Sequence, residues 1–317
     1  MMKKRTQNDN ALVIGVSACL LGESVRYDGG HKTHDFVTEV VGRLCRVESI
    51  CPEVEAGLGV PRPAVHLVAV DGGIHAIGRD DEALDITAVI SAFNRAKVPA
   101  LHHLSGYIFK SRSPSCGLNV TVLPDGRAPG LFAAAVRNSY PLLPCIEDDE
   151  LGNPMVQSNF LERVVAYRRW QAFMASMPGF DDLVTFHGRN ALLLMSHGRG
   201  GYNALSQRVG DVDDNADLAA ILAEYGRGYM AHVARQSTRS MHVEVLHAAL
   251  ERLSKRVPRA KITEFKQLIV AFEQGRCGLW GPLGALRMLV EGEVGSDLTS
   301  QNYLYPSVLE VKFKVIF

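Results

Sequence analysis

Three cysteines in the first half of the chain occupy the same kind of position, directly after an apolar, strand-like run. Cys19 follows "LVIGVSA", Cys51 follows "VESI", and Cys116 follows "GYIFKSRSPS". Ligands of an open parallel sheet bind outside the carboxyl ends of its strands. Three thiolates that meet at such an edge can hold one metal centre and leave a coordination position open for substrate, as in catalytic metal sites. The alternative is that each cysteine is buried as a small apolar side chain, which is common for free cysteine.

Polar side chains suited to acid–base or anion chemistry lie close to these cysteines in the sequence. Glu53 follows Cys51 by two residues, and Ser113 and Ser115 lie just before Cys116. Ser115 is a candidate substrate-binding residue, and the stretches "VRYDGGHK" and "GLGVPRP" add four more at the same sheet edge: Arg26, Tyr27, Asp28 and Arg62. From the residues alone, a surface carboxylate at position 53 and an ordinary turn serine at position 113 are the favoured interpretations.

The elements that must position these residues alternate between strand and helix. Apolar runs predict strands within residues 11–22, 47–53 and 106–117, a hairpin over 64–78 with its turn at 71–73, and helices over 34–46 and 85–98. Such alternation is typical of an α/β domain with a mostly parallel sheet. We expect this domain to span residues 1–150.

The second half of the chain has a different pattern. Its apolar residues recur at helical spacing over 159–174, 186–198, 217–236, 241–257 and 262–275, and strand signals are few. An acidic stretch over 145–156 contains glycine and proline and is expected to be the linker. The sequence therefore predicts a mostly α-helical second domain over residues 151–317.

Composition indicates a globular protein and excludes several other classes. The chain has 317 residues, 47% of them hydrophobic and 21% charged, with a formal net charge of zero. No apolar run approaches the roughly 18–20 residues that a membrane span requires, and the basic, polar start lacks the features of a signal peptide. The six cysteines include no CxxC pair, which excludes zinc-ribbon and ferredoxin-like spacing. We expect a cytoplasmic protein with no membrane partner, and core packing for Cys45, Cys145 and Cys277.

Basic residues are concentrated in one part of the helical half. Residues 225–276 contain ten Lys or Arg and four Asp or Glu. A basic surface of this kind can follow the phosphates of RNA, although a solvated helix face is an equal alternative. The candidate RNA-binding residues are Arg252, Lys255, Arg256, Arg259 and Lys261. We expect no DNA partner.

Together the motifs resemble a known family. "SACLLGESVRYDGGHK", "CPEVEAGLGVPRP" and "KSRSPSCG" resemble the motifs of the thiouracil desulfurase (TudS) family and cover most of residues 11–150. The second half resembles the YbgA domain through "FHGRNALLLMSH", the run from "MHVEVLHAAL" onward and "QNYLYPSVLEVK". The fused arrangement is similar to bacterial desulfidases that remove sulfur from 4-thiouridine in transfer RNA.

The resemblance implies a cofactor and a reaction. It implies a [4Fe-4S] cluster with three ligands, Cys19, Cys51 and Cys116, whose fourth iron is open to the substrate's sulfur. Glu53 would be the acid/base residue, and Ser113 would assist it at the reacting carbon. A soft thiocarbonyl sulfur suits iron in a thiolate-ligated cluster, and a nearby carboxylate can activate water. The implied reaction is a non-redox hydrolysis of thiouridine to uridine and hydrosulfide, with the helical domain helping to bind the thiolated RNA.

Three alternatives stand beside this interpretation. The substrate can be free 2-thiouracil or another small thiobase rather than transfer RNA. The protein can also be a non-catalytic iron–sulfur sensor or an RNA-binding protein. In the third alternative the cysteines are structural and no metal binds.

Overall fold

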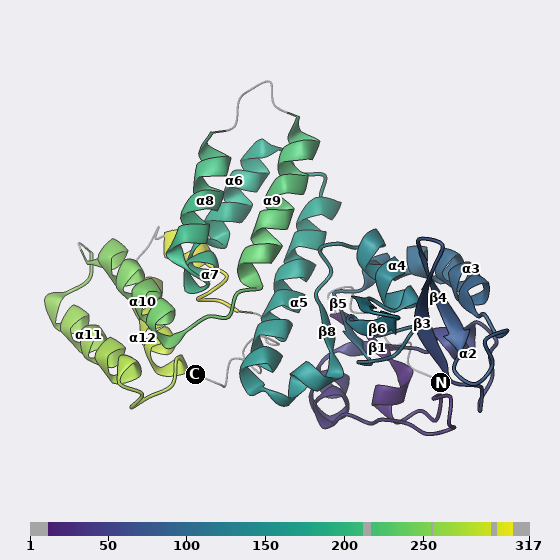
Figure 1. Cartoon of the computed structure of the whole chain (residues 1–317). Coiled ribbons are helices and arrows are strands. Elements are labelled where there is room, and N and C mark those ends of the chain that lie inside the picture. Colours follow the sequence, from purple (N-terminus) through teal and green to yellow (C-terminus); the bar gives the residue numbers. More distant parts are fainter. Residues whose placement is uncertain (1–11, 212–216, 255, 293–296, 307–317) are drawn as a thin grey trace, which may run out of the picture. The chain divides into compact units, whose positions relative to one another are not determined.

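The computed structural model describes residues 12–211, 217–254, 256–292 and 297–306. The chain divides into two compact units, Met1–Asn153 and Pro154–Phe317 (Figure 1). The first unit is an α/β domain and the second is helical, which confirms the predicted fold class.

The first unit contains a four-stranded parallel sheet. Its strands are β1 (Val13–Ser17), β2 (Arg46–Ile50), β5 (Gly106–Phe109) and β8 (Cys145–Glu147), in the order β2-β1-β5-β8. All three strand pairs are parallel. Every residue of β1 and β5 is buried, as expected for the central strands of a parallel sheet.

Helical segments connect these strands. They are η1 (Ala18–Leu21), η2 (Phe36–Val41), α1 (Gly42–Leu44), α2 (Pro52–Glu55), α3 (Thr87–Lys97), η3 (Val98–His103), α4 (Leu131–Ser139) and η4 (Asp148–Gly152). The helix predicted over 34–46 is a π-helix over most of its length, followed by the short α1. The helix predicted over 85–98 is α3.

A second sheet in the same unit has the order β4-β3-β6-β7. Strands β3 (Val65–Val70) and β4 (Gly73–Gly78) are the predicted hairpin. Its turn places Asp71 and Gly72 at positive φ, which favours glycine at the second position. Strands β6 (Val120–Leu123) and β7 (Gly126–Ala128) form a hairpin that we did not predict, although "VTVLPDGRA" combines β-branched residues with a turn sequence.

The stretch expected to be a linker, residues 145–156, is mostly ordered structure of the first unit. Its first three residues form β8 and pair with β5. The next five form η4, which begins with a reciprocal capping box between Glu147 and Glu150. The acidic residues that suggested a linker therefore cap a helical turn and, at Asp148, bind a lysine of the candidate site.

The second unit consists of helices in the part of it that the structure describes. These are α5 (Pro154–Ala175), α6 (Phe180–Arg189), α7 (Ala191–Ser196), α8 (Arg199–Gly210), α9 (Leu218–Val233), α10 (Arg239–Leu253), α11 (Arg259–Glu273), α12 (Trp280–Glu291) and η5 (Asp297–Ser300). One buried core joins α7, α10, α11 and α12. An aromatic cluster joins α5, α6 and α9, where a Cβ at Gly226 would lie 2.6 Å from the ring of Trp170. None of the helices described is both long and apolar enough to cross a lipid bilayer.

Two buried histidines in this unit predict a pH-dependent stability. His187 lies between the hydroxyls of Tyr225 (3.0 Å) and Ser206 (2.9 Å), and Nε2 of His232 lies 2.8 Å from the carbonyl oxygen of Leu194. Burial lowers the pKa of both imidazoles below the ordinary value of 6.5. The unfolded chain therefore binds protons at a pH where the folded chain does not.

We expect the helical unit to be most stable above pH 6.5 and to lose stability as the pH falls through the lowered pKa values. Thermal unfolding between about pH 7.5 and about pH 5 measures this dependence. His187→Gln should lower the slope of Tm against pH, whereas His247→Gln, at an exposed position of α10, should leave it unchanged. Equal slopes for wild type and His187→Gln would contradict the prediction.

Candidate active site at the edge of the parallel sheet

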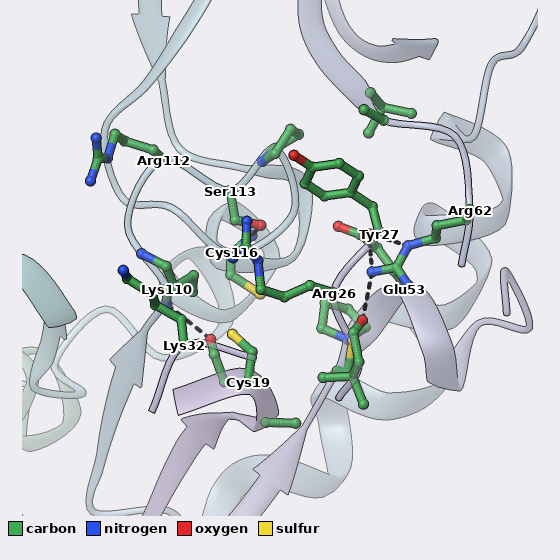
Figure 2. Close-up of a pocket in the computed structure, with 18 of the residues that line it drawn as sticks. Cys19, Arg26, Tyr27, Lys32, Glu53, Arg62, Lys110, Arg112, Ser113 and Cys116 are labelled. Carbon is green, nitrogen blue, oxygen red and sulfur yellow. Dashed lines mark hydrogen bonds and ion pairs between the residues drawn. The ribbon is translucent and has the colours of Figure 1, made fainter. Parts of the chain in front are cut away.

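The carboxyl ends of β2, β1 and β5 meet at one edge of the parallel sheet, and the three cysteines lie there. Cys19 follows the end of β1 by two residues, Cys51 follows β2 directly, and Cys116 lies on the loop after β5. All three side chains line one cavity of about 430 Å³. Figure 2 shows the sulfur atoms of Cys19 and Cys116 directed toward the same space. The structure thus brings together residues that are far apart in the sequence.

Burial raises the pKa of each of these thiols. The pKa of Cys19 rises to about 11 because of burial, opposed by the ammonium group of Lys110 and increased by Cys51. Burial also raises the pKa of Cys51. The pKa of Cys116 lies well above its ordinary value because of burial, and a hydrogen bond with Ser17 opposes this effect. The three thiols therefore lie within electrostatic reach of one another.

The sulfur ligands fit a soft, positively charged metal centre. Metal-binding cysteines are thiolates, and buried thiolates that repel one another need positive charge nearby. The residues that the structure describes include no group of three or more His, Cys, Asp or Glu arranged around a single metal ion. In an iron–sulfur cluster each thiolate binds a different iron, so its ligands lie further apart than the ligands of one ion. Three thiols that line one cavity can thus supply three ligands to such a cluster.

The loop that carries Cys116 is held by the first turn of α4. Backbone N–H groups of that turn donate to the carbonyl oxygens of Pro114 and Ser115 at 2.9–3.1 Å, and Gly130 N–H donates to Gly117 O at 2.8 Å. A Cβ at Gly130 would lie 2.6 Å from the carbonyl oxygen of Pro114. This close backbone approach requires glycine and fixes the position of the loop.

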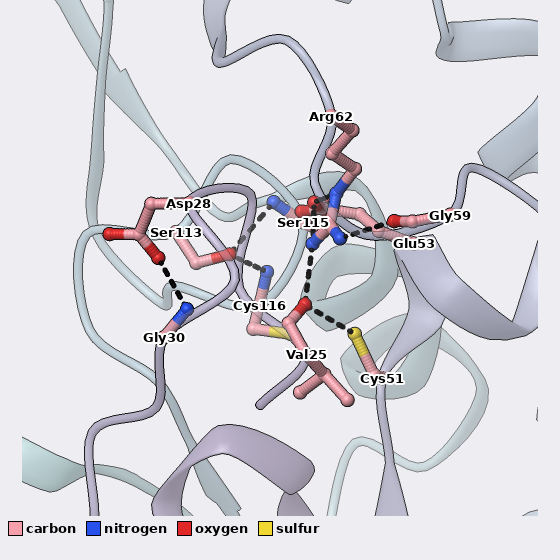
Figure 3. Close-up of polar contacts among 10 residues, drawn as sticks. All are labelled: Val25, Asp28, Gly30, Cys51, Glu53, Gly59, Arg62, Ser113, Ser115 and Cys116. Carbon is pink, nitrogen blue, oxygen red and sulfur yellow. Dashed lines mark hydrogen bonds and ion pairs between the residues drawn. The ribbon is translucent and has the colours of Figure 1, made fainter. Parts of the chain in front are cut away.

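Ser113 organises the same loop and faces the cavity. Its Oγ accepts hydrogen bonds from the N–H groups of Cys116 (3.1 Å) and Ser115 (3.3 Å), as Figure 3 shows. This is the geometry of an ordinary turn serine. Because Oγ accepts both bonds, the hydroxyl proton remains available to a ligand in the cavity.

Glu53 lies in the first turn of α2 and is held on both oxygens. Arg62 approaches Oε2 at 2.6 Å through Nε and Nη2, and Ser115 Oγ donates to Oε1 at 2.7 Å (Figure 3). The side chains of Glu53 and Arg62 are only 13% and 8% exposed, so water screens the pair weakly. Arg62 also donates to the carbonyl oxygens of Gly59 and Val25 at 2.9 and 3.0 Å. Arg62 and Ser115, which we expected to bind substrate, thus orient Glu53.

The other residues expected to bind substrate lie at the cavity or beside it. Arg26 and Tyr27 line the cavity, and the guanidinium group lies 5.6 Å from the centre of the Tyr27 ring. The carboxylate of Asp28 accepts a hydrogen bond from Gly30 N–H at 3.0 Å and lies 3.6 Å from Arg26. Asp28 therefore shapes its own turn and orients Arg26.

The sequence analysis missed further polar residues of the cavity, among them Lys110, whose side chain is 16% exposed. Its ammonium group lies 2.9 Å from Asp148 Oδ2 and 3.0 Å from Ser111 Oγ. A charged residue directly after the apolar run of β5 was the signal available in the sequence. Lys32, Arg79 and Arg112 also line the cavity, and among the described residues their side chains have no hydrogen-bond or ion-pair partner.

The residues expected to bind RNA lie around the junction of α10 and α11. Arg252, Arg256, Arg259 and Lys261 are exposed, and Arg252 forms an ion pair with Asp297 at 3.1 Å. Lys255 lies outside the described residues. No cavity described in this unit is lined by these residues.

A groove of about 560 Å³ lies instead along α8 and α9. Its lining includes small residues, among them Gly201, Gly228 and Ala231. It also includes three arginines, of which Arg208 pairs with Glu224, whereas Arg227 and Arg235 have no side-chain partner among the residues described. A groove with free guanidinium groups is suited to an anionic ligand.

The close packing of the cysteine loop on α4 gives a testable expectation. Gly130→Ala should destabilise the first unit by about 1–3 kcal/mol, the usual cost of overpacking, because the new Cβ would displace Pro114 and Ser115. Gly126→Ala is the matched control, since its Cβ would lie 3.7 Å from Val122, an ordinary contact. Chemical denaturation measures both, and equal stability of the two variants would contradict the expectation.

Comparisons with known proteins identify both parts of the chain. Residues 14–148 match the family model described as 2-thiouracil desulfurase, and residues 192–307 match a family described as a protein of unknown function, DUF1722. No curated protein matches the chain. A solved structure titled "[4Fe-4S]-dependent thiouracil desulfidase TudS" is 27% identical, covers 44% of this chain and 93% of its own, and has a TM-score of 0.37. The chain therefore carries a domain of the 2-thiouracil desulfurase family over residues 14–148, followed by a DUF1722 domain over residues 192–307.

Proposed function

We propose that this protein is an iron–sulfur-dependent desulfidase that replaces the sulfur of a thiolated uracil by oxygen, with 4-thiouridine in transfer RNA as its substrate. The observation that carries the proposal is the shared cavity of Cys19, Cys51, Cys116 and Glu53 in a domain that matches the 2-thiouracil desulfurase family. The reaction consumes water and releases hydrosulfide, and the oxidation state of the substrate carbon does not change.

Cys19, Cys51 and Cys116 would hold a [4Fe-4S] cluster and leave one iron without a protein ligand. When bound, the cluster supplies a soft Lewis acid for the thiocarbonyl sulfur. The protein contributes the three thiolates, and Lys110 contributes a positive charge near Cys19. Cys19 and Cys116 are buried, whereas Cys51 is partly exposed.

Glu53 is the proton-transferring group in this proposal. Arg62 and Ser115 fix its carboxylate in the cavity wall, where it can take a proton from the attacking water and return it to a ring nitrogen. Ser113 has a hydroxyl proton available and can donate a hydrogen bond to the oxygen that adds to the reacting carbon. Both residues act on the substrate, whereas Arg62 and Ser115 act by holding Glu53.

The charge of the cavity favours a phosphate-bearing substrate over a free base. Lys32, Arg79 and Arg112 line the cavity without partners among the described residues. A neutral thiobase offers these cations only uncharged acceptors, whereas a nucleotide within RNA places phosphates beside the reacting base. The groove between α8 and α9 offers further free arginines for the phosphates of a larger RNA.

Free thiouracil is the second candidate, because the matched family is described by that substrate. Reconstitution of the cluster without oxygen, followed by incubation with thiolated transfer RNA or with free 2-thiouracil, compares the two. Loss of the near-ultraviolet absorbance of the thiobase reports desulfuration. We expect turnover of the RNA to exceed that of the free base.

The residue roles are tested in the same assay. Cys116→Ala should abolish cluster uptake, whereas Glu53→Gln should keep the cluster and lower kcat by about 10²–10⁴, the usual contribution of a general acid or base. Glu53→Gln with wild-type turnover would contradict the proposed role. A cluster that forms in the wild type while neither substrate reacts would favour an iron–sulfur sensor.

The groove predicts a separate effect on RNA affinity. The double variant Arg227→Gln, Arg235→Gln should raise KM for transfer RNA and lower the slope of log affinity against log salt by about two, one for each lost phosphate contact. Turnover of free thiobase should not change. The control is Arg252→Gln, whose side chain is already paired with Asp297. If this control weakens RNA binding and the double variant does not, the RNA contact lies on α10 rather than in the groove.

A further inference from the structure

Tyr27 is an aromatic residue of the cysteine cavity to which the proposed reaction assigns no role. It lines the cavity and is 42% exposed. Cys19 and Cys116 line the same cavity but are only 7% and 6% exposed. Figure 2 shows the Tyr27 ring apart from their sulfur atoms. The ring therefore lies at the mouth of the cavity, and the sulfurs lie deeper in it.

The turn that carries Tyr27 is held by hydrogen bonds of its own backbone. Gly29 N–H donates to the carbonyl oxygen of Arg26 at 2.9 Å, and Arg26 N–H donates to that of Gly30 at 3.1 Å. The carbonyl oxygen of Tyr27 accepts from Arg62 N–H at 2.9 Å. A segment that is already ordered loses little conformational freedom when a ligand binds. The ring is thus preorganised at the mouth of the cavity.

The Tyr27 side chain has few partners within the protein. The guanidinium carbon of Arg26 lies over the ring, 5.6 Å from its centre. In the part of the chain that the structure describes, no other ring or cation stacks on Tyr27, and its hydroxyl has no hydrogen-bond partner. Unstacked RNA bases bind to aromatic rings and to arginine side chains of this kind. The exposed part of the ring is therefore suited to a nucleobase.

A thiolated base within RNA reaches the buried cysteines only when it leaves its own stack. Enzymes that act on a base bind it in a single strand or turn it out of a helix. The neighbouring base then loses a stacking partner, and the RNA backbone keeps it close to the cavity. Tyr27 at the mouth can replace that partner. A free thiobase has no such neighbour.

We propose that Tyr27 is a stacking platform for the base that neighbours the thiolated one, so that this aromatic contact helps to select RNA over a free thiobase. The inference rests on the proposed function, because it takes thiolated RNA as the substrate.

The first test compares full-length Tyr27→Leu and Tyr27→Phe with the wild type after reconstitution without oxygen. The substrates are free 4-thiouracil and a short single-stranded oligoribonucleotide with one 4-thiouridine between two adenosines. Tyr27→Leu should lower the preference in kcat/KM for the oligonucleotide over the free base about tenfold, a usual effect of losing one base–aromatic stack. Tyr27→Phe keeps the ring and should keep the preference. An unchanged preference in Tyr27→Leu, or an equal loss in Tyr27→Phe, would overturn the proposal.

A change in the RNA tests the same contact without a change in the protein. Two further oligonucleotides lack the base on the 5′ side or on the 3′ side of the thiouridine. One of these abasic sites should lower kcat/KM of the wild type about tenfold. The same site should have little further effect on Tyr27→Leu, because the contact is already lost. A wild type that is insensitive to both abasic sites would overturn the proposal, as would losses that add fully in Tyr27→Leu.

A wild type that desulfurates none of these substrates would refute the proposed function instead. The stack is then measured as binding, by titration of the protein with fluorophore-labelled oligonucleotides that carry uridine in place of 4-thiouridine. Tyr27→Leu should bind about tenfold more weakly than Tyr27→Phe and should not distinguish the complete oligonucleotide from the abasic one. Equal affinities of the two variants would show that no base stacks on Tyr27.

Discussion

The electrostatic cost of ionising three thiols in one buried cavity determines how the rest of the site is arranged. Burial raises the pKa of Cys19, Cys51 and Cys116, and the thiols add to one another's effect. The surrounding protein opposes this cost with Lys110 and Arg26 near Cys19, and with Arg62 near Cys51. The basic groups around the cavity thus favour negative charge on these sulfurs.

The parallel sheet makes this concentration of thiols possible. Neighbouring parallel strands end at the same edge, so three short segments of chain reach one cavity without a long loop. Each segment is then fixed by backbone contacts outside the cavity. The first turn of α4 holds the loop of Cys116, and Glu55 accepts a hydrogen bond from the N–H of Cys51 at 3.1 Å. The sheet and these contacts therefore set the positions of the three cysteine sulfurs.

The sequence predicts the features that depend on local pattern. Apolar runs followed by cysteine placed Cys19, Cys51 and Cys116 at strand ends, and helical spacing identified most of the second unit. Contacts between distant segments were not predictable in this way. The pairing of Glu53 with Arg62 and Ser115 depends on how α2 and two loops pack together, and the bond from Lys110 to Asp148 depends on the register of β5 and β8. The acidic stretch around Asp148 looked like a linker because its partners lie elsewhere in the chain.

The contacts of Glu53 also constrain how a carboxylate held by an arginine can act as a base. Arg62 donates a hydrogen bond from Nε to Oε2 and holds Nη2 at 2.6 Å from the same oxygen, whereas Oε1 accepts one hydrogen bond, from the neutral hydroxyl of Ser115. Charge-assisted hydrogen bonds are stronger than neutral ones, so Oε2 is the less basic oxygen. A proton taken up on Oε1 leaves the hydrogen bond and the ion pair of Oε2 with Arg62 intact, and Ser115 can still bond to the second lone pair of Oε1. Arg62 therefore orients Glu53 through one oxygen and leaves the other bound only to a neutral hydroxyl, and Oε1 is the oxygen that the proposed proton transfer would use.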